Sequence, residues 1–121
     1  MIKVVSLFKK KDGLSDEEFR DYYENNHSNL FADHLKVPGV KRYTRRYLEP
    51  IPDSITGAVR HSGFDVIMEV WCDEEWYTNY FVNQVPADFR ALVAEDEEKL
   101  FDRNQMYTHI VKEYDTDLSA L

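Results

Sequence analysis

Histidine is the side chain that transfers protons most readily near neutral pH, and this sequence contains four histidines. They are His27, His34, His61 and His109. His27 lies four residues after Tyr23 and eight after Phe19, at the edge of the apolar stripe of a predicted helix. A side chain there would point into the gap between helix and sheet, where a carboxylate partner would raise its basicity. The same position also suits a histidine that caps the helix end or binds a backbone carbonyl.

Two further candidates, His109 and Glu69, lie in the middle of predicted strands. His109 shares a strand face with Tyr107 and Val111, and Glu69 shares one with Trp71. A carboxylate is costly to bury unless it is paired, so Glu69 is either an acid in a pocket or the partner of an arginine on the neighbouring strand. These arginines are Arg42, Arg45 and Arg46. Trp71 is either a core residue or a platform for a ligand.

Tyr43 and Tyr47 place two hydroxyl groups on one face of the same predicted strand. In a cleft they could bind a phenol or carbonyl oxygen or donate a proton. Alternatively, they pack against a second copy of the chain. We therefore take His27 and His109 as candidate catalytic residues. The candidate substrate-binding residues are Tyr43, Tyr47, Glu69 and Trp71.

The sequence lacks the common motifs for cofactors and metals. It contains no G-x-x-x-x-G-K-[ST], G-x-G-x-x-G or G-x-S-x-G motif, and it has only four glycines. No two histidines have the H-E-x-x-H spacing, and His27 and His34 would share a helix face only if the helix extends that far. Cys72 is the only cysteine, which excludes an internal disulfide and a cysteine cluster. The sequence predicts neither a cofactor nor a bound metal.

Length and charge place the protein in a broad class. A chain of 121 residues fits one domain, and 43% hydrophobic residues are enough for a single core. The net charge of −8 has the wrong sign for a general nucleic-acid binder. No apolar run approaches the length of about 20 residues that a membrane span needs, and no leader peptide is visible. We expect a cytoplasmic protein that binds neither nucleic acid nor membranes.

Alternation of apolar residues predicts four strands that position these candidates. The predicted strands are residues 2–10, 40–48, 64–72 and 104–114. Residues 49–63 form a long connection without clear periodicity, which is typical of either a lid or a disordered excursion.

Capping signals predict the helices between the strands. Ser15 and Glu18 have the spacing of a capping box at the start of a helix over residues 16–31. Asp73 caps a second helix, and Pro86 suits the first turn of a third. In the third helix we interpret the acidic run of residues 95–98 as a face exposed to solvent.

The resulting order, β-α-β-β-α-(α)-β, predicts a ferredoxin-like α+β fold with a four-stranded antiparallel sheet and its helices on one face. The other face of the sheet would then be uncovered. Yet the strands carry apolar residues on both faces, for example Ile2 and Val5 in the first strand and Val66 and Ile67 in the third. The simplest cover is the same face of a second copy, so we expect a homodimer.

The segments carrying these elements resemble the EthD family over nearly the whole chain. The similar segments are residues 2–15, 18–23, 26–27, 37–43, 65–73, 101–102 and 109–111. They include the strand ending in lysines, the Gly-Leu-Ser turn, the Glu-Phe and Tyr-Tyr pairs of the first helix, and His27 at the position of the family's histidine. Where members often have a small residue and proline after this histidine, the chain has Ser28-Asn29-Leu30.

The resemblance implies a dimeric α+β barrel, formed here by residues 1–114 with a tail at 115–121. It also implies a small-molecule pocket in each subunit between sheet and helices. Relatives in the wider superfamily include cofactor-free cyclases, isomerases, dehydratases and monooxygenases, and also haem enzymes. The EthD branch is associated by name with ether degradation, and similar domains accompany aromatic catabolism and polyketide pathways.

We therefore expect a cofactor-independent enzyme, a lyase, isomerase or cyclase, that transfers a proton on a hydrophobic, aromatic or polyketide-like oxygenated compound. His27 would act as general acid or base, while His109, Tyr43 or Tyr47 would polarise an oxygen. One alternative is a dimeric binding protein that holds a hydrophobic metabolite without converting it. Another is a haem or oxygen-using protein with histidine as the axial ligand.

Overall fold

The structure is a computed structural model, and it describes residues 1–35, 39–83 and 85–120. Two residues of the EthD-like segments, Val37 and Pro38, lie outside the described residues, and so does the side chain of His34. In the described part of the chain, no helix combines the length and the apolar composition that crossing a bilayer requires.

The sheet has the predicted four strands, all paired antiparallel. They are β1 (Ile2–Lys10), β2 (Val40–Tyr47), β3 (Val66–Cys72) and β4 (Phe101–Val111), in the order β2-β3-β1-β4. The predicted range 104–114 for the last strand is three residues too late. Phe101 already pairs with Lys10, and Val111 pairs with Lys3 at the start of β1, so residues after Val111 have almost no strand left to pair with.

The first helical segment begins where the capping box places it. Ser15 Oγ accepts from the Glu18 amide, and the Glu18 carboxylate accepts from the Ser15 amide, both at 3.1 Å. The helix then runs as α1 (Asp16–Tyr22), a π-helical turn η1 (Tyr23–His27) and α2 (Ser28–Leu35), and so extends beyond the predicted end. A π-helical turn inside an α-helix is rare and often marks a functional site.

The second helical segment also starts as predicted, because the Asp73 side chain accepts from the Trp76 amide at 2.8 Å. It comprises α3 (Glu74–Tyr77) and a second π-helical turn, η2 (Thr78–Val82). The third helix is α4 (Ala87–Leu100). Pro86 is the residue just before α4. A short 3-10 turn, η3 (Leu118–Ala120), follows β4 near the C-terminus.

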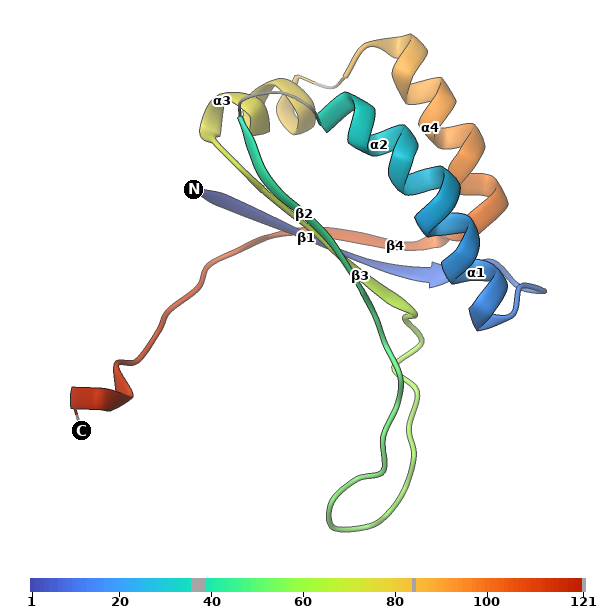
Figure 1. The fold of residues 1–121 in the computed structure, drawn as a ribbon, viewed down its shortest axis with the longest axis vertical. Helices are drawn as coiled ribbons and strands as arrows, with labels where there is room; N and C mark the ends of the chain where they lie inside the picture. The colour runs from blue at the N-terminus through green and yellow to red at the C-terminus, as the bar shows by residue number, and fades with distance from the viewer. Residues whose placement is uncertain (36–38, 84, 121) are drawn as a thin grey trace.

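All the longer helices pack on one face of the sheet (Figure 1). The core between the two layers contains Phe8 and Val66 from the sheet, Phe19 and Tyr23 from the first helical segment, and Leu100 from α4. Each of them is at least 94% buried. This α+β arrangement, with four antiparallel strands below the helices, confirms the predicted fold class.

The opposite face of the sheet, which we call the open face, carries the alternate strand residues. Val5, Leu7, Ile67 and Trp71 lie on it and are only partly buried. None of the described helices covers this face (Figure 1).

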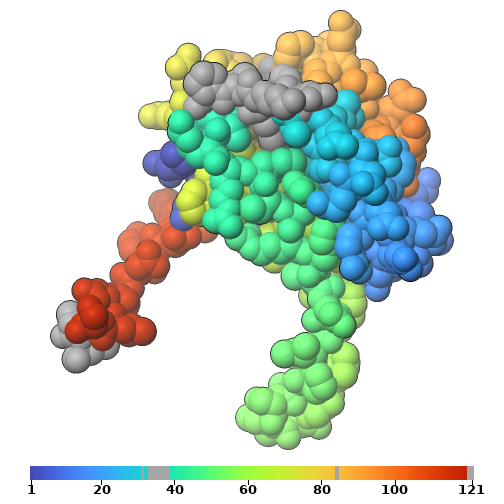
Figure 2. Space-filling view, viewed as in Figure 1, coloured from blue at the N-terminus to red at the C-terminus, as the bar shows by residue number. Residues whose placement is uncertain are grey.

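Two projections extend from the body. We call residues 48–65, which connect β2 to β3, the arm, and residues 112–120, which follow β4, the tail. Both stand clear of the compact body in the space-filling view, the arm in green and the tail in red (Figure 2). The arm contains the predicted long connection, and it has internal order, including an isolated bridge between Pro52 and Val59.

Candidate functional site

His27 is the last residue of the π-helical turn and lies in the interior, with 2% of its surface exposed. Its ring packs edge-on against Tyr23 and Phe101, with ring centroids 5.3 and 5.4 Å away. Those two aromatic rings are part of the core that joins the helix to the sheet. The histidine therefore points inward, as the helical periodicity predicts, and does not serve as an exposed helix cap.

The partner of His27 is a carboxylate on α4. Asp96 Oδ2 lies 2.8 Å from His27 Nδ1, and the Tyr22 hydroxyl donates to Asp96 Oδ1 at 2.5 Å. The Asp96 side chain is only 16% exposed. Three side chains from two helices thus form one hydrogen-bonded unit, Tyr22–Asp96–His27.

Asp96 was missed by the sequence analysis, because the interpretation of residues 95–98 as a solvent-exposed face holds for Glu95 and Glu98 but is wrong for Asp96 and Glu97. An acidic run of four residues spans more than one helical turn, so part of it has to face inward. Asp96 lies three residues after Val93 and four before Leu100, which are the buried residues of α4. That helical spacing indicates that Asp96 lies on the buried side of α4, and it could have been recognised in the sequence.

Burial and hydrogen bonding set the protonation states of this unit. Burial lowers the pKa of His27 below its ordinary value, and the hydrogen bond and charge of Asp96 only partly oppose this effect. The neutral imidazole that results donates from Nδ1 to the carboxylate and keeps its lone pair on Nε2. The hydrogen bond to Asp96 raises the pKa of Tyr22 to about 12, so its hydroxyl stays a donor. The arrangement is that of a proton-transfer pair with a fixed tautomer.

A groove of about 340 Å³ runs between the first helical segment and α4 and reaches this unit. Asp96 and Tyr22 both line it. Donors come from Asn25, Asn26 and Lys99, and apolar walls from Leu30 and Leu92. A small apolar compound that carries an oxygen could lie here with its reacting atom against the carboxylate.

Tyr43 and Tyr47 lie on the helix side of the sheet, as does His27, but they belong to a different network. Arg45 Nε and Nη2 donate to Glu24 at 2.7 and 2.9 Å, and the Tyr47 hydroxyl donates to the same carboxylate at 2.5 Å. Burial raises the pKa of Tyr43, which neighbours Tyr23. These contacts join the first helical segment to β2, and neither Tyr43 nor Tyr47 lines the groove at Asp96.

His109, Glu69 and Trp71 lie on the open face. His109 and Glu69 both pair with Val5, on the two sides of β1, whereas its neighbour Val4 belongs to the helix side. The sheet therefore separates His109 from His27 within one chain. The sequence pattern cannot show that the two histidines lie on opposite sides of the sheet. The periodicity of a helix or strand shows which residues share a face of that element, but not which element that face packs against.

The neighbours of Glu69 match the ion pair considered for it, whereas Trp71 is on the open face and is not part of the core. Arg46 Nη1 lies 2.9 Å from Glu69 Oε2, so Glu69 has an arginine partner on the neighbouring strand. Trp71 lies between two cations, with Lys3 Nζ at 4.2 Å and the Arg42 guanidinium at 4.9 Å from its ring.

Within the described residues, no three histidine, cysteine, aspartate or glutamate side chains are grouped so that they could hold a metal ion. Histidine can also hold haem iron as the axial ligand. However, the His27 ring is packed edge-on against Tyr23 and Phe101, and its Nδ1 is bonded to Asp96. These neighbours do not fit a porphyrin beside the ring, so we derive no step through haem.

Taken together, the antiparallel four-stranded sheet, the helices on one face and the element order define an α+β protein of the ferredoxin-like type. More narrowly, the chain belongs to the EthD family, since the EthD domain matches residues 11–104.

Solved structures support the fold. An EthD family protein from Bacillus halodurans is 21% identical, with a TM-score of 0.60 over 94% of this chain and 99% of its own. The Arabidopsis thaliana protein At3g17210 is 16% identical, with a TM-score of 0.59 over 98% of this chain and 100% of its own. No curated protein matches the chain.

Proposed function

We propose that this protein is an enzyme that transfers a proton on a small oxygenated compound without a cofactor, and that the Asp96–His27 pair is its acid and base. The observation that carries the proposal is a buried histidine bonded to a carboxylate that itself lines a groove. In such pairs the carboxylate holds the imidazole in one orientation and one tautomer through the hydrogen bond.

The reaction that suits the groove is removal of a proton next to a carbonyl group. The C–H bond breaks, its electron pair moves to the carbonyl oxygen as an enolate, and the proton passes to Asp96, backed by His27. Carboxylates serve as the base for this step in several enzymes. Lys99 and the amides of Asn25 and Asn26 line the same groove and would stabilise the enolate oxygen.

An enolate formed in this way can lose a leaving group, take a proton at another carbon or attack a second carbonyl. The corresponding classes are lyase, isomerase and cyclase. Leu30 and Leu92 provide apolar walls for an aromatic or polyketide-like substrate. This substrate class rests on family likeness together with the size and lining of the groove.

We also propose that the chain works as a homodimer in which the open faces of two copies pack together. Val5, Leu7 and Ile67 are apolar residues of this face that the helices leave uncovered, next to the ion pair of Arg46 and Glu69. Burial of such surfaces is the main driving force of association between subunits. Each groove lies within a single chain, so the dimer and the chemistry are separate proposals.

Deuterium exchange tests the chemistry without knowledge of the natural substrate. The protein is incubated in D2O with a panel of β-keto acids, aromatic ketones and phenols, and loss of C–H signals is followed by proton NMR. We expect exchange next to a carbonyl in at least one compound, and a 10²–10⁴-fold slower rate in Asp96→Asn and His27→Gln, the usual range for loss of an acid or base. Glu98→Gln, on an exposed face of the same helix, is the matched control and keeps the rate.

Two outcomes would refute the proposal. One is exchange that persists in both variants. The other is a compound that shifts the amide signals of Asn25 and Asn26 on binding but shows no exchange in the native protein, which would mark a binding protein.

A further inference from the structure

The arm and the tail carry large apolar side chains that the chain itself does not cover. On the arm, Ile51, Ile55 and Val59 are 78%, 93% and 62% exposed. On the tail, Tyr114 and Leu118 are 91% and 73% exposed. Single exposed apolar residues are ordinary, but three with more than 60% exposure on one short arm are candidates for contact with a partner.

The tip of the arm is held in one conformation by its own hydrogen bonds. The Asp53 carboxylate accepts from the amides of Ile55 and Thr56, both at 2.9 Å, and the Asp53 backbone bonds to Ala58 and Gly57 at 2.8 and 2.9 Å. Gly57 supplies the positive φ of +73° that the turn needs. Ile55 is therefore presented outward on a defined turn and does not fold back on the body.

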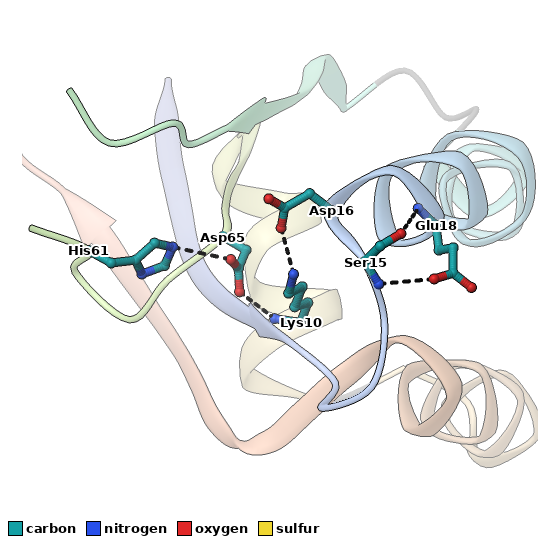
Figure 3. A network of polar contacts seen from close by, with 6 residues as sticks. All are labelled: Lys10, Ser15, Asp16, Glu18, His61 and Asp65. Carbon is teal, nitrogen blue, oxygen red and sulfur yellow. Dashed lines mark hydrogen bonds and ion pairs between the residues drawn. The ribbon is translucent and has the colours of Figure 1, made fainter. Parts of the chain in front are cut away.

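The base of the arm is tied to the body by a polar network (Figure 3). The Asp65 carboxylate accepts from the Lys10 amide at 2.8 Å and lies 3.5 Å from His61 Nε2. His61 Nδ1 accepts from the Gly63 amide at 2.9 Å, which leaves the Nε2 hydrogen facing Asp65. The Lys10 ammonium pairs with Asp16 at the start of α1, at 2.6 Å. These contacts fix the direction in which the arm leaves the sheet.

That direction is significant because the two projections flank the open face. The arm leaves from β2 and β3 at one side of the sheet, and the tail leaves from β4 at the other edge. In Figure 1 both extend away from the helices, with the open face between them. A body that docks on the open face would therefore lie between the arm and the tail.

We infer that the arm of one copy packs the side chains of Ile51, Ile55 and Val59 against a second copy of this chain, outside the contact between the two sheets. The inference rests on the homodimer proposed above and adds a second contact to it. In a twofold pair, an arm that reaches across is matched by the partner's arm reaching back, so each dimer contains the contact twice.

Geometry favours a second copy as the occupant, because the arm flanks the open face on which that copy is proposed to dock, and charge argues against a lipid surface. The chain carries a net charge of −8, and the arm itself contains three acidic residues, Glu49, Asp53 and Asp65, against one arginine, Arg60. Anionic bilayers repel such a surface. Two copies also repel each other, so the contact has to gain its free energy from apolar burial, which the isoleucines at the tip can supply.

Sedimentation velocity over a concentration series tests the inference with Ile55→Asp. The monomer should fold as before, because Ile55 is 93% exposed in it. Since each dimer loses two buried isoleucines, we expect the dimer dissociation constant to rise at least 100-fold. The matched control is Val82→Asp, which changes an aliphatic side chain that is 62% exposed on η2; it should leave dimerisation unchanged.

Methyl NMR gives a second measurement. The sequence contains five isoleucines, so a sample labelled only at isoleucine methyl groups gives five resolvable signals. In an equal mixture of labelled and unlabelled chains, Ile51 and Ile55 should show contacts to protons of the unlabelled copy.

The possible failures can be told apart. A native protein that stays monomeric overturns both the dimer and the arm contact but leaves the groove chemistry standing. A dimer unaffected by Ile55→Asp, with no intermolecular signal at Ile55, overturns the arm contact alone. Co-sedimentation of the native protein with phosphatidylserine vesicles, abolished by Ile55→Asp, would assign the arm to a membrane and also overturn it.

Discussion

The substitution Asp96→Asn removes the carboxylate oxygen that accepts from His27 and keeps the size of the side chain. Asparagine has the size of aspartate and keeps an oxygen for the Tyr22 hydroxyl, which now donates at 2.5 Å. The atom that replaces Oδ2 is an NH2 group, which cannot accept from His27 Nδ1. To keep a hydrogen bond, His27 has to become the acceptor at Nδ1 and move its proton to Nε2.

The expected loss of stability follows from replacing a hydrogen bond to a charged carboxylate with one to a neutral amide. A hydrogen bond to a charged group contributes about 1.5–3 kcal/mol, and a neutral one about 0.5–1.5 kcal/mol. With the site 84% or more buried, little of this difference is screened by solvent. We expect the free energy of unfolding to fall by about 1–2 kcal/mol, which for a domain of this size lowers Tm by roughly 4–8 °C.

Two assays check the prediction at pH 7. Urea unfolding gives the loss of stability, with Glu98→Gln as the control for removal of one negative charge from α4. Nitrogen-15 NMR of the imidazole identifies the protonated nitrogen, which should be Nδ1 in the native protein and Nε2 in the variant. Equal stability of the two variants, together with an unchanged His27 tautomer, would refute the assignment of Asp96 as the partner that orients His27.

Three further predictions concern stability. Because burial lowers the pKa of His27, the unfolded chain binds a proton below about pH 6.5 that the folded protein does not. The free energy of unfolding should therefore decrease as pH falls from 6.5 to 5. His27→Gln should make this decrease smaller, and an equally steep decrease in the variant would contradict the lowered pKa. Ser15→Ala removes the cap on the Glu18 amide and should cost about 1 kcal/mol in thermal unfolding. Leu100→Ala, at a side chain with 0% exposure, should lower the free energy of unfolding by about 2–5 kcal/mol. Leu92→Ala, at a side chain with 50% exposure, should lower it far less. Similar decreases in the two variants would mean that Leu100 is not a core residue.

Local signals in the sequence were enough to predict the fold. The capping box at Ser15 and the cap at Asp73 act within three residues of their partners, so the sequence contains both halves of each interaction. Alternation along β1 and β3 predicts which residues face each way, because the side-chain period of a strand is two. The boundaries were less accurate where pairing decides them, as at the end of β4.

The candidate site was predicted only in part. Helical periodicity placed His27 inward, but its partner Asp96 is 69 positions away on another helix, and nothing near either residue links the two. The role of Glu69 could not be predicted from the sequence either, because its strand pattern is equally compatible with an acid in a pocket and with an ion pair. The neighbouring strand resolved this by placing Arg46 beside the carboxylate.

By itself, the sequence determined the elements, their order, the residues that share a face of each strand and the inward side of the first helix, because hydrogen bonds, caps and side-chain periods act over a few residues. Only the tertiary structure decided which inward sides meet. It placed His27 and Asp96 against each other across two helices and put His109 behind the sheet, because such contacts depend on strand order and helix packing and on no local pattern. It also revealed that the arm and the tail leave the body on either side of the open face.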